Sequence, residues 1–173
     1  MRKILAVLCT PALAGAVVAA TPTAASATLT LVNCAGTTTV EFSPALTDTT
    51  QTVAVSGADE GGCVSLTHPG LNAFTAPFSG TATQSCTSFF AGGSGTETLY
   101  WNDSTTSAWN YTNSFSNVNG TKVGTSTGTI ASGTLAGADV TQTITFVNLN
   151  LTACSTTGLS DISGTSAWTF SDL

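Results

Sequence analysis

Basic side chains are nearly missing from this sequence of 173 residues. Lysine and arginine together number three, against nine acidic residues and a single histidine. Arg2 and Lys3 stand at the start of the chain, so only Lys122 carries a basic side chain in the rest of it. Nucleic-acid binding depends on lysine and arginine side chains that neutralise phosphates. We therefore exclude nucleic-acid partners, and for the same reason anionic membrane surfaces and phosphorylated substrates.

Long apolar runs are confined to the beginning of the chain. A short basic start is followed there by a mostly apolar segment, 4–18, and by the small-residue cleavage pattern Ala25-Ser26-Ala27. This order is typical of a secretory signal peptide and is too short for a membrane span. We expect residues 1–27 to be removed after Ala27, with Ala20 as the alternative cleavage site.

Cleavage would leave residues 28–173, a length that predicts one secreted, extracellular domain with a sizeable core. The acidic balance favours solubility. We expect no membrane insertion of the mature chain, a monomeric state, and an unknown partner outside the cell or at the cell envelope.

Closely spaced cysteines are also missing. Four remain after cleavage, and an even number in an exported chain predicts two disulfides. Three pairings are possible, and we favour one of them. No C-x-x-C spacing occurs and only one histidine is available, so we expect no metal site and no cofactor. The favoured pairs are Cys34–Cys63 and Cys86–Cys154.

No segment has convincing helical periodicity. Apolar and polar residues instead alternate over short runs, the pattern of half-buried strands. About eight such runs predict an all-β fold, an antiparallel β-sandwich of immunoglobulin-like layout, with a partly open barrel as the alternative. Two interruptions are expected: a loop at "GADEGG", residues 57–62, and a strand break at Pro77.

The segment "GTSTG", residues 124–128, matches the G-x-S-x-G pattern that presents a nucleophilic serine in some hydrolases. The dipeptide Asn119-Gly120 just before it is a strong hairpin signal. A two-residue turn there places "GTSTG" inside a strand, with Phe115 over Gly124, Tyr111 over Gly128, and Asn113 within hydrogen-bonding reach of Ser126.

If Ser126 were the nucleophile of a hydrolase, it would need a histidine partner. The only histidine, His68, lies in the segment "THPGLN", where no pattern places it near Ser126. A nucleophile elbow also needs a following helix, and none is predicted. We therefore expect no catalytic residues and no enzymatic activity.

Acidic residues offer two weaker candidates. Glu97 shares strand parity with Leu99 and Trp101, and a Trp101–Ser107 pairing would place Glu97 opposite Tyr111 at the rim of the sandwich. No register places a second carboxylate beside it, as glycoside hydrolysis would require. The adjacent acids Asp59-Glu60 supply too few oxygen ligands for calcium.

Aromatic residues divide into a core set and an exposed set. Trp101, Trp109, Tyr111, Phe115 and Trp168 follow the apolar parity, and we expect them in the core. Tyr100 has the opposite parity, and Phe89-Phe90 lies in a glycine-flanked loop. These three are the candidates for exposed binding contacts, although single exposed apolar residues are common.

Three segments carry a family resemblance: "GTTTVEFSPALTDTTQTVAVSG", "GTETLYWNDSTTSAW" and "GTIASGTLAGADVTQTITFVNLNLTAC". With them the chain resembles a group of small secreted actinobacterial proteins rich in threonine, serine and glycine. The resemblance spans nearly the whole mature chain and implies an exported β-sandwich domain. It implies no activity and no catalytic residues.

Two hypotheses for the function follow. The first is a non-enzymatic extracellular module with a structural or interaction role. The second is a carrier that binds a small ligand or glycan in a cleft between sheets. A solvent-accessible pocket lined by Trp101, Trp109 and Tyr111 would favour the carrier, and a filled interior would favour the module.

Overall fold

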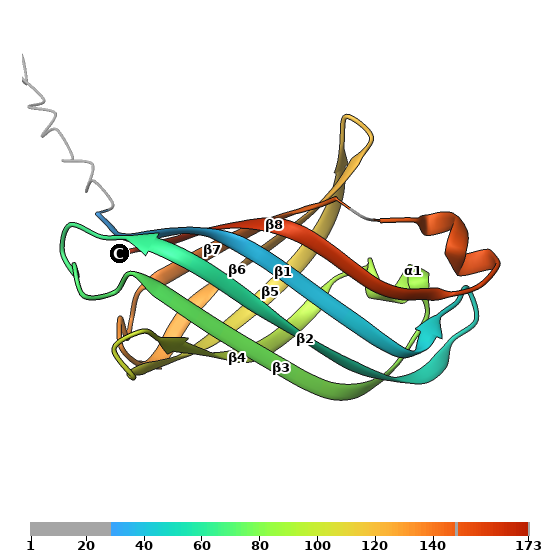
Figure 1. Cartoon of the computed structure of the whole chain (residues 1–173), viewed down its shortest axis with the longest axis horizontal. Coiled ribbons are helices and arrows are strands. Elements are labelled where there is room, and N and C mark those ends of the chain that lie inside the picture. Colours follow the sequence, from blue (N-terminus) through green and yellow to red (C-terminus); the bar gives the residue numbers. More distant parts are fainter. Residues whose placement is uncertain (1–28, 148, 173) are drawn as a thin grey trace, which may run out of the picture.

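The computed structural model describes residues 29–147 and 149–172. The expected signal peptide, residues 1–27, lies outside the described part of the chain. Eight antiparallel strands follow one another around a closed barrel (Figure 1). Their bounds are β1 (Thr30–Leu46), β2 (Gln51–Val64), β3 (Ala73–Gln84), β4 (Gly93–Trp101), β5 (Thr106–Val118), β6 (Thr121–Gly133), β7 (Asp139–Phe146) and β8 (Leu159–Ser171).

The closed barrel corrects the expected immunoglobulin-like sandwich. Strand β1 pairs with β2 on one side and with β8 on the other, so the two ends of the chain close one sheet. The all-β class, the antiparallel pairing and the number of strands are confirmed. Inward and outward residues alternate along strands in sandwiches and barrels alike, so the pattern could not separate the two.

Strand β2 continues through the segment that was expected to be a loop. Its inward-facing residues include Val53, Asp59 and Cys63, which all lie on the same parity. Two inward glycines lie under aromatic rings of β3: a Cβ on Gly57 would come within 2.6 Å of the Phe78 ring. Glycine is therefore needed at this position for an aromatic side chain to pack over the backbone.

The β5–β6 hairpin is confirmed pair by pair. Asn119 and Gly120 both have positive φ, as a two-residue type I′ turn requires, and Asn113 lies opposite Ser126. Phe115 packs over Gly124, because a Cβ there would meet its ring at 3.2 Å. Two finer predictions are wrong. The glycine under the Tyr111 ring is Gly95 rather than Gly128, because a Cβ on Gly95 would lie 2.7 Å from the Tyr111 hydroxyl. In the described structure, no hydrogen bond joins Asn113 to Ser126.

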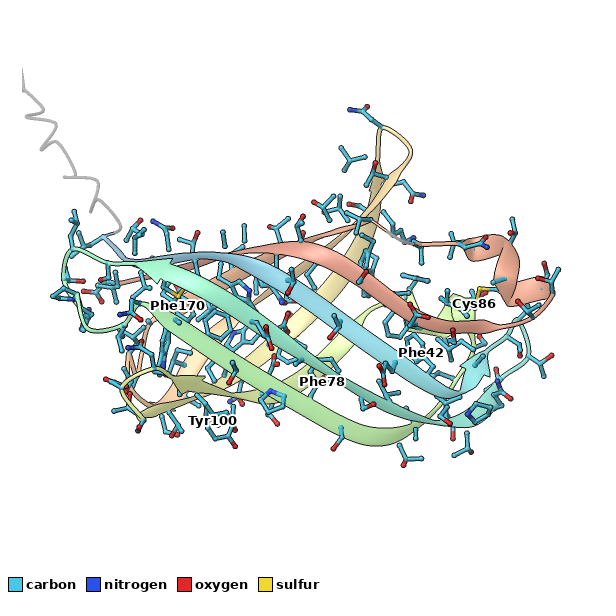
Figure 2. All side chains as sticks on the ribbon, viewed as in Figure 1. Phe42, Phe78, Cys86, Tyr100 and Phe170 are labelled. Carbon is cyan, nitrogen blue, oxygen red and sulfur yellow. A yellow bond between two sulfur atoms is a disulfide. The ribbon has the colours of Figure 1, made fainter. Side chains whose placement is uncertain are left out.

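Two apolar clusters fill the two ends of the barrel. Figure 2 shows Phe170 at one end and Phe42 with Cys86 at the other. The first cluster contains the three tryptophans, Trp101, Trp109 and Trp168, which are buried as expected. The second cluster gathers around Phe42, Leu46, Val53, Phe146 and Leu159.

The two disulfides have the predicted pairing, and one lies at each end of the barrel. Cys34–Cys63 joins β1 to β2 beside the tryptophan cluster. Cys86–Cys154 joins the helical turn α1 (Cys86–Phe89) to the 3-10 helix η1 (Leu151–Ser155) beside the second cluster. Within the described residues, no helix has the length and apolarity needed to cross a membrane.

The seam between β3 and β4 is the weakest part of the barrel wall. Only two residue pairs join these strands, Phe74 with Trp101 and Thr75 with Tyr100. Strand β3 then diverges from β4 while it stays paired with β2 (Figure 1). Pro77 follows directly and has no N–H to donate, which suits a strand edge. The expected break at Pro77 is therefore a break in pairing to β4, while β3 itself continues.

We predict that Cys86→Ala with Cys154→Ala lowers the free energy of unfolding by about 2–4 kcal/mol, because the bridge closes a long loop. Urea denaturation followed by tryptophan fluorescence measures the change. Hydrogen exchange should increase at α1 and η1, and the tryptophan end should keep its protection. Equal loosening of both ends would contradict the local role of this bridge, and Cys34→Ala with Cys63→Ala is the matched control.

Candidate functional site

A cavity of about 220 Å³ lies inside the barrel between the two apolar clusters. Every strand contributes to its wall, and so does α1. Its lining residues are Thr38, Val40, Val55, Asp59, Phe78, Phe89, Glu97, Tyr111, Asn113, Phe115, Gly124, Ser126, Gln142, Ile144, Phe146 and Ile162. The cavity is therefore the part of the barrel lumen that side chains do not fill.

Six polar side chains from six strands form a layer across the lumen on the tryptophan side of the cavity. We call these residues the polar layer: Thr38, Asp59, Glu97, Asn113, Ser126 and Gln142. Thr38 donates a hydrogen bond to Asp59, and Gln142 Nε2 donates another at 3.0 Å to the same oxygen, Oδ1. Asp59 is only 4% exposed, and these two bonds replace part of its lost hydration.

The carboxyl groups of Asp59 and Glu97 form a hydrogen-bonded pair. Burial raises the pKa of Asp59 to about 6, although its bonds from Thr38, Gln142 and Glu97 oppose the rise. Burial, the charge of Asp59 and the hydrogen bond between them raise the pKa of Glu97 to about 9. At neutral pH the pair therefore keeps one proton, with protonated Glu97 donating to ionised Asp59.

Two polar atoms of this layer have no partner. Glu97 Oε1 and Asn113 Oδ1 are buried without a hydrogen-bond partner, as is Trp109 Nε1 in the adjacent cluster. Ser126, a residue only 5% exposed, presents its side chain to the same cavity. Unpaired buried polar atoms are rare and costly in native proteins. A ligand in the cavity would satisfy the two in the layer.

Aromatic rings form the opposite wall of the cavity. Phe89 and Phe115 lie with ring centroids 5.7 Å apart, and Phe115 lies 6.0 Å from Phe146. Tyr111 packs on Trp109 at 4.6 Å, and burial is the main cause that raises the pKa of its phenol. The cavity thus has a polar side and an aromatic side, as ligand sites commonly do.

The cavity lies beside the open part of the β3–β4 seam. Phe78 comes from β3, Glu97 from β4 and Phe89 from the turn that joins these strands, and all three side chains are half-buried. Strands on either side of this gap share no ladder beyond Thr75 and Tyr100. The cavity wall is therefore partly exposed to solvent along this seam.

The three expected contact residues fall in three different places. Phe89 lines the cavity from α1, and Phe90 packs behind it with a centroid distance of 5.0 Å. Lys122 Nζ lies 4.9 Å from the Phe90 ring, outside the cavity lining. Tyr100 is 49% exposed on the outer face of β4 and does not line the cavity (Figure 2).

Ser126 and His68 do not come together. Ser126 faces the lumen from β6, whereas His68 is exposed in the loop between β2 and β3 and is hydrogen-bonded to Thr67. Strand β6 continues through "GTSTG" to Gly133 with no helix after it. His68 is therefore not placed to act as a base for Ser126, which lies in the wall of the cavity.

Asp59 is the residue that sequence reasoning missed. The expectation that no second carboxylate lies beside Glu97 is wrong, because "GADEGG" is strand and its parity turns Asp59 inward. The β4–β5 register also differs: Leu99 lies opposite Ser107, and Glu97 lies opposite Trp109 rather than Tyr111. Extending the alternation of Val53 and Val55 to Cys63 would have found Asp59.

A three-residue group with metal-ligand atoms occurs elsewhere on the described surface. Asp48 lies near the sulfur atoms of Cys86 and Cys154. Both sulfurs belong to the disulfide, so they supply no thiolate to an ion. This group therefore has one metal-binding side chain rather than three.

No protein-family model, no curated protein and no solved structure matches this chain. The resemblance to secreted actinobacterial proteins stays a prediction. The geometry and chemistry of the barrel interior are therefore the basis for a functional proposal.

We predict that Glu97→Gln flattens the dependence of stability on pH. Glu97 binds its proton more tightly in the folded state than in the unfolded state, so this contribution is full below its ordinary pKa of 4.5 and is lost as the pH rises towards about 9. Between these two pH values the free energy of unfolding should fall more steeply with pH in the wild type than in the variant, by up to about 1.4 kcal/mol per pH unit. Urea denaturation at several pH values measures it.

Glu60→Gln is the matched control, because Glu60 is exposed on the outer face of the same strand as Asp59. It makes the same side-chain replacement without touching the lumen. A Glu97→Gln variant whose stability falls with pH in parallel with the wild type would contradict the shared proton.

Proposed function

We propose that the protein is a secreted, non-enzymatic carrier that binds one small molecule inside its barrel. The observation that supports it is a cavity of about 220 Å³ with aromatic rings on one side and unpartnered polar atoms on the other. Eight-stranded barrels have an interior of a size that can hold one small ligand. A structural or interaction module would need no such cavity, so the carrier hypothesis is the better supported of the two.

The volume limits the size of the ligand. A cavity of about 150 Å³ lined by apolar side chains is enough to bind benzene. The lumen cavity is somewhat larger and has a polar side. A molecule with one ring and a short polar substituent fits both properties, whereas an oligosaccharide does not.

Of the three aromatic residues that would line the pocket of a carrier, only one lines the cavity. Tyr111 lines the cavity, while Trp101 and Trp109 are buried in the apolar cluster next to it. These tryptophans make a rigid floor under the polar layer. Trp109 supports the ring of Tyr111 directly.

Two observations support binding rather than catalysis. His68 lies away from Ser126, and the carboxyl groups of Asp59 and Glu97 are hydrogen-bonded to each other. Glycoside hydrolysis uses carboxyl groups about 5 Å or more apart, with the substrate between them. The two disulfides fit an oxidising compartment, and the N-terminal pattern fits export.

We predict that Ser126→Leu abolishes binding of small neutral aromatic compounds, because the longer side chain occupies the cavity. The first probe is 2-phenylethanol, titrated into the oxidised protein by isothermal calorimetry. Wild-type protein should bind it with one site per chain. Far-UV circular dichroism checks that the variant keeps its strands.

Thr127→Leu is the matched control, because Thr127 is the next residue of β6 and is exposed on the outer face. It should bind the probe as the wild type does. Equal binding by both variants would place the ligand outside the lumen. If the wild type binds no single-ring compound, the proposed carrier function is wrong.

A further inference from the structure

The lumen holds two carboxyl groups and no cationic side chain. Lys122 is the only lysine or arginine of the described residues, and its ammonium group lies over Phe90 rather than in the cavity. Asp59 and Glu97 therefore face each other without a counter-charge from the chain. Buried carboxylates in proteins are normally paired with a cation or with several hydrogen-bond donors.

The partners missing from the polar layer are donors. Two of the three unsatisfied buried atoms, Glu97 Oε1 and Asn113 Oδ1, belong to this layer and can accept, whereas the third, Trp109 Nε1, is a donor in the adjacent cluster. The hydroxyl of Ser126 can also accept. A neutral hydroxyl on a ligand offers one donor. A primary ammonium offers three, together with the positive charge that the lumen lacks.

The aromatic side of the cavity suits the remainder of such a ligand. Phe89, Phe115 and Phe146 form an apolar wall for a ring. Tyr111 lies between this wall and the carboxyl pair, and an aromatic face also attracts an ammonium group. The volume leaves space for one ring and a short chain.

We propose that the ligand of the lumen is a small arylalkyl primary amine, with its ammonium group held by Asp59, Glu97 and Asn113 and its ring against Phe89 and Phe115. This inference rests on the proposed carrier function, and it names the chemical class of the ligand. The ammonium supplies the missing counter-charge, and the aromatic wall excludes water from the contact.

Binding of the ammonium should release a proton. The titratable groups that face the pair are Asp59 from β2, Glu97 from β4 and Tyr111 from β5; the other strands and α1 contribute only neutral groups to the cavity wall. A nearby cation favours the ionised form of Glu97, so the O–H bond of its carboxyl breaks and the proton passes to the buffer. Affinity for the amine should therefore rise with pH while the ligand remains protonated.

The test compares three probes of one shape by calorimetry: 2-phenylethylamine, neutral 2-phenylethanol and anionic phenylacetate. The amine should bind about tenfold or more tightly than the alcohol, since hydrogen bonds to charged groups are the stronger ones, and phenylacetate should not bind. Repeating the amine titration in buffers of different ionisation enthalpy measures the released proton.

Glu97→Gln and Asp59→Asn should each lower the ratio of amine affinity to alcohol affinity about tenfold or more, because they remove the charge-assisted contact that only the amine makes. Far-UV circular dichroism checks that both variants keep their strands. Glu60→Gln, on the outer face, is the matched control and should bind the amine as the wild type does.

The outcomes separate the two proposals. If the alcohol binds and the amine binds no more tightly, the carrier function holds and the ligand class is wrong. If amine binding is unchanged in both carboxyl variants, the ammonium is not at the pair and the inference is overturned. If none of the three probes binds, the carrier function itself fails.

Discussion

Closure of the barrel is the constraint on which the interior of this protein depends. Once β8 pairs with β1, every inward residue of eight long strands must share one lumen. Side chains that are distant in sequence then meet at the same height. Gln142 and Asp59, which are 83 residues apart, share a hydrogen bond for this reason. The polar layer is a product of register around a closed sheet rather than of any local motif.

The layer is expensive to bury, and the surrounding residues explain how it is tolerated. Thr38 and Gln142 donate to Asp59, and the proton on Glu97 spares the lumen a second charge. Apolar clusters on both sides hold the strands in register and keep water from the tryptophan side. The polar atoms of the layer that remain without a partner face the cavity. The free-energy cost of burying them is therefore concentrated where another molecule can enter.

Local pattern predicted much of this structure and stopped at its long-range features. The Asn119-Gly120 turn and the register of its hairpin follow from short-range signals and are confirmed. The favoured one of three possible disulfide pairings is also confirmed. In another segment, glycines led to a wrong prediction of a loop. In "GADEGG" two of the three glycines, Gly57 and Gly61, are inward residues under aromatic rings, which resemble loop glycines in sequence. Because that segment was expected to be a loop, Asp59 was not predicted to face inward, and the partner of Glu97 was missed.

The difference between sandwich and barrel has a similar cause. Alternation reports which face of a strand is inward, but it does not report which strand lies next to it. The decisive pairing, β1 with β8, joins the two ends of the chain. Nothing in Thr30–Leu46 or Leu159–Ser171 taken separately specifies that contact.

The short β3–β4 ladder has a consequence for the behaviour of the protein at high concentration. Beyond Thr75 and Tyr100 both strands present edges, and an exposed edge can pair with a strand of another molecule. Pro77 removes a donor from one edge, and the inward carboxyl of Glu97 penalises pairing along the other. The same residue that shapes the lumen thus also disfavours edge-to-edge pairing between molecules.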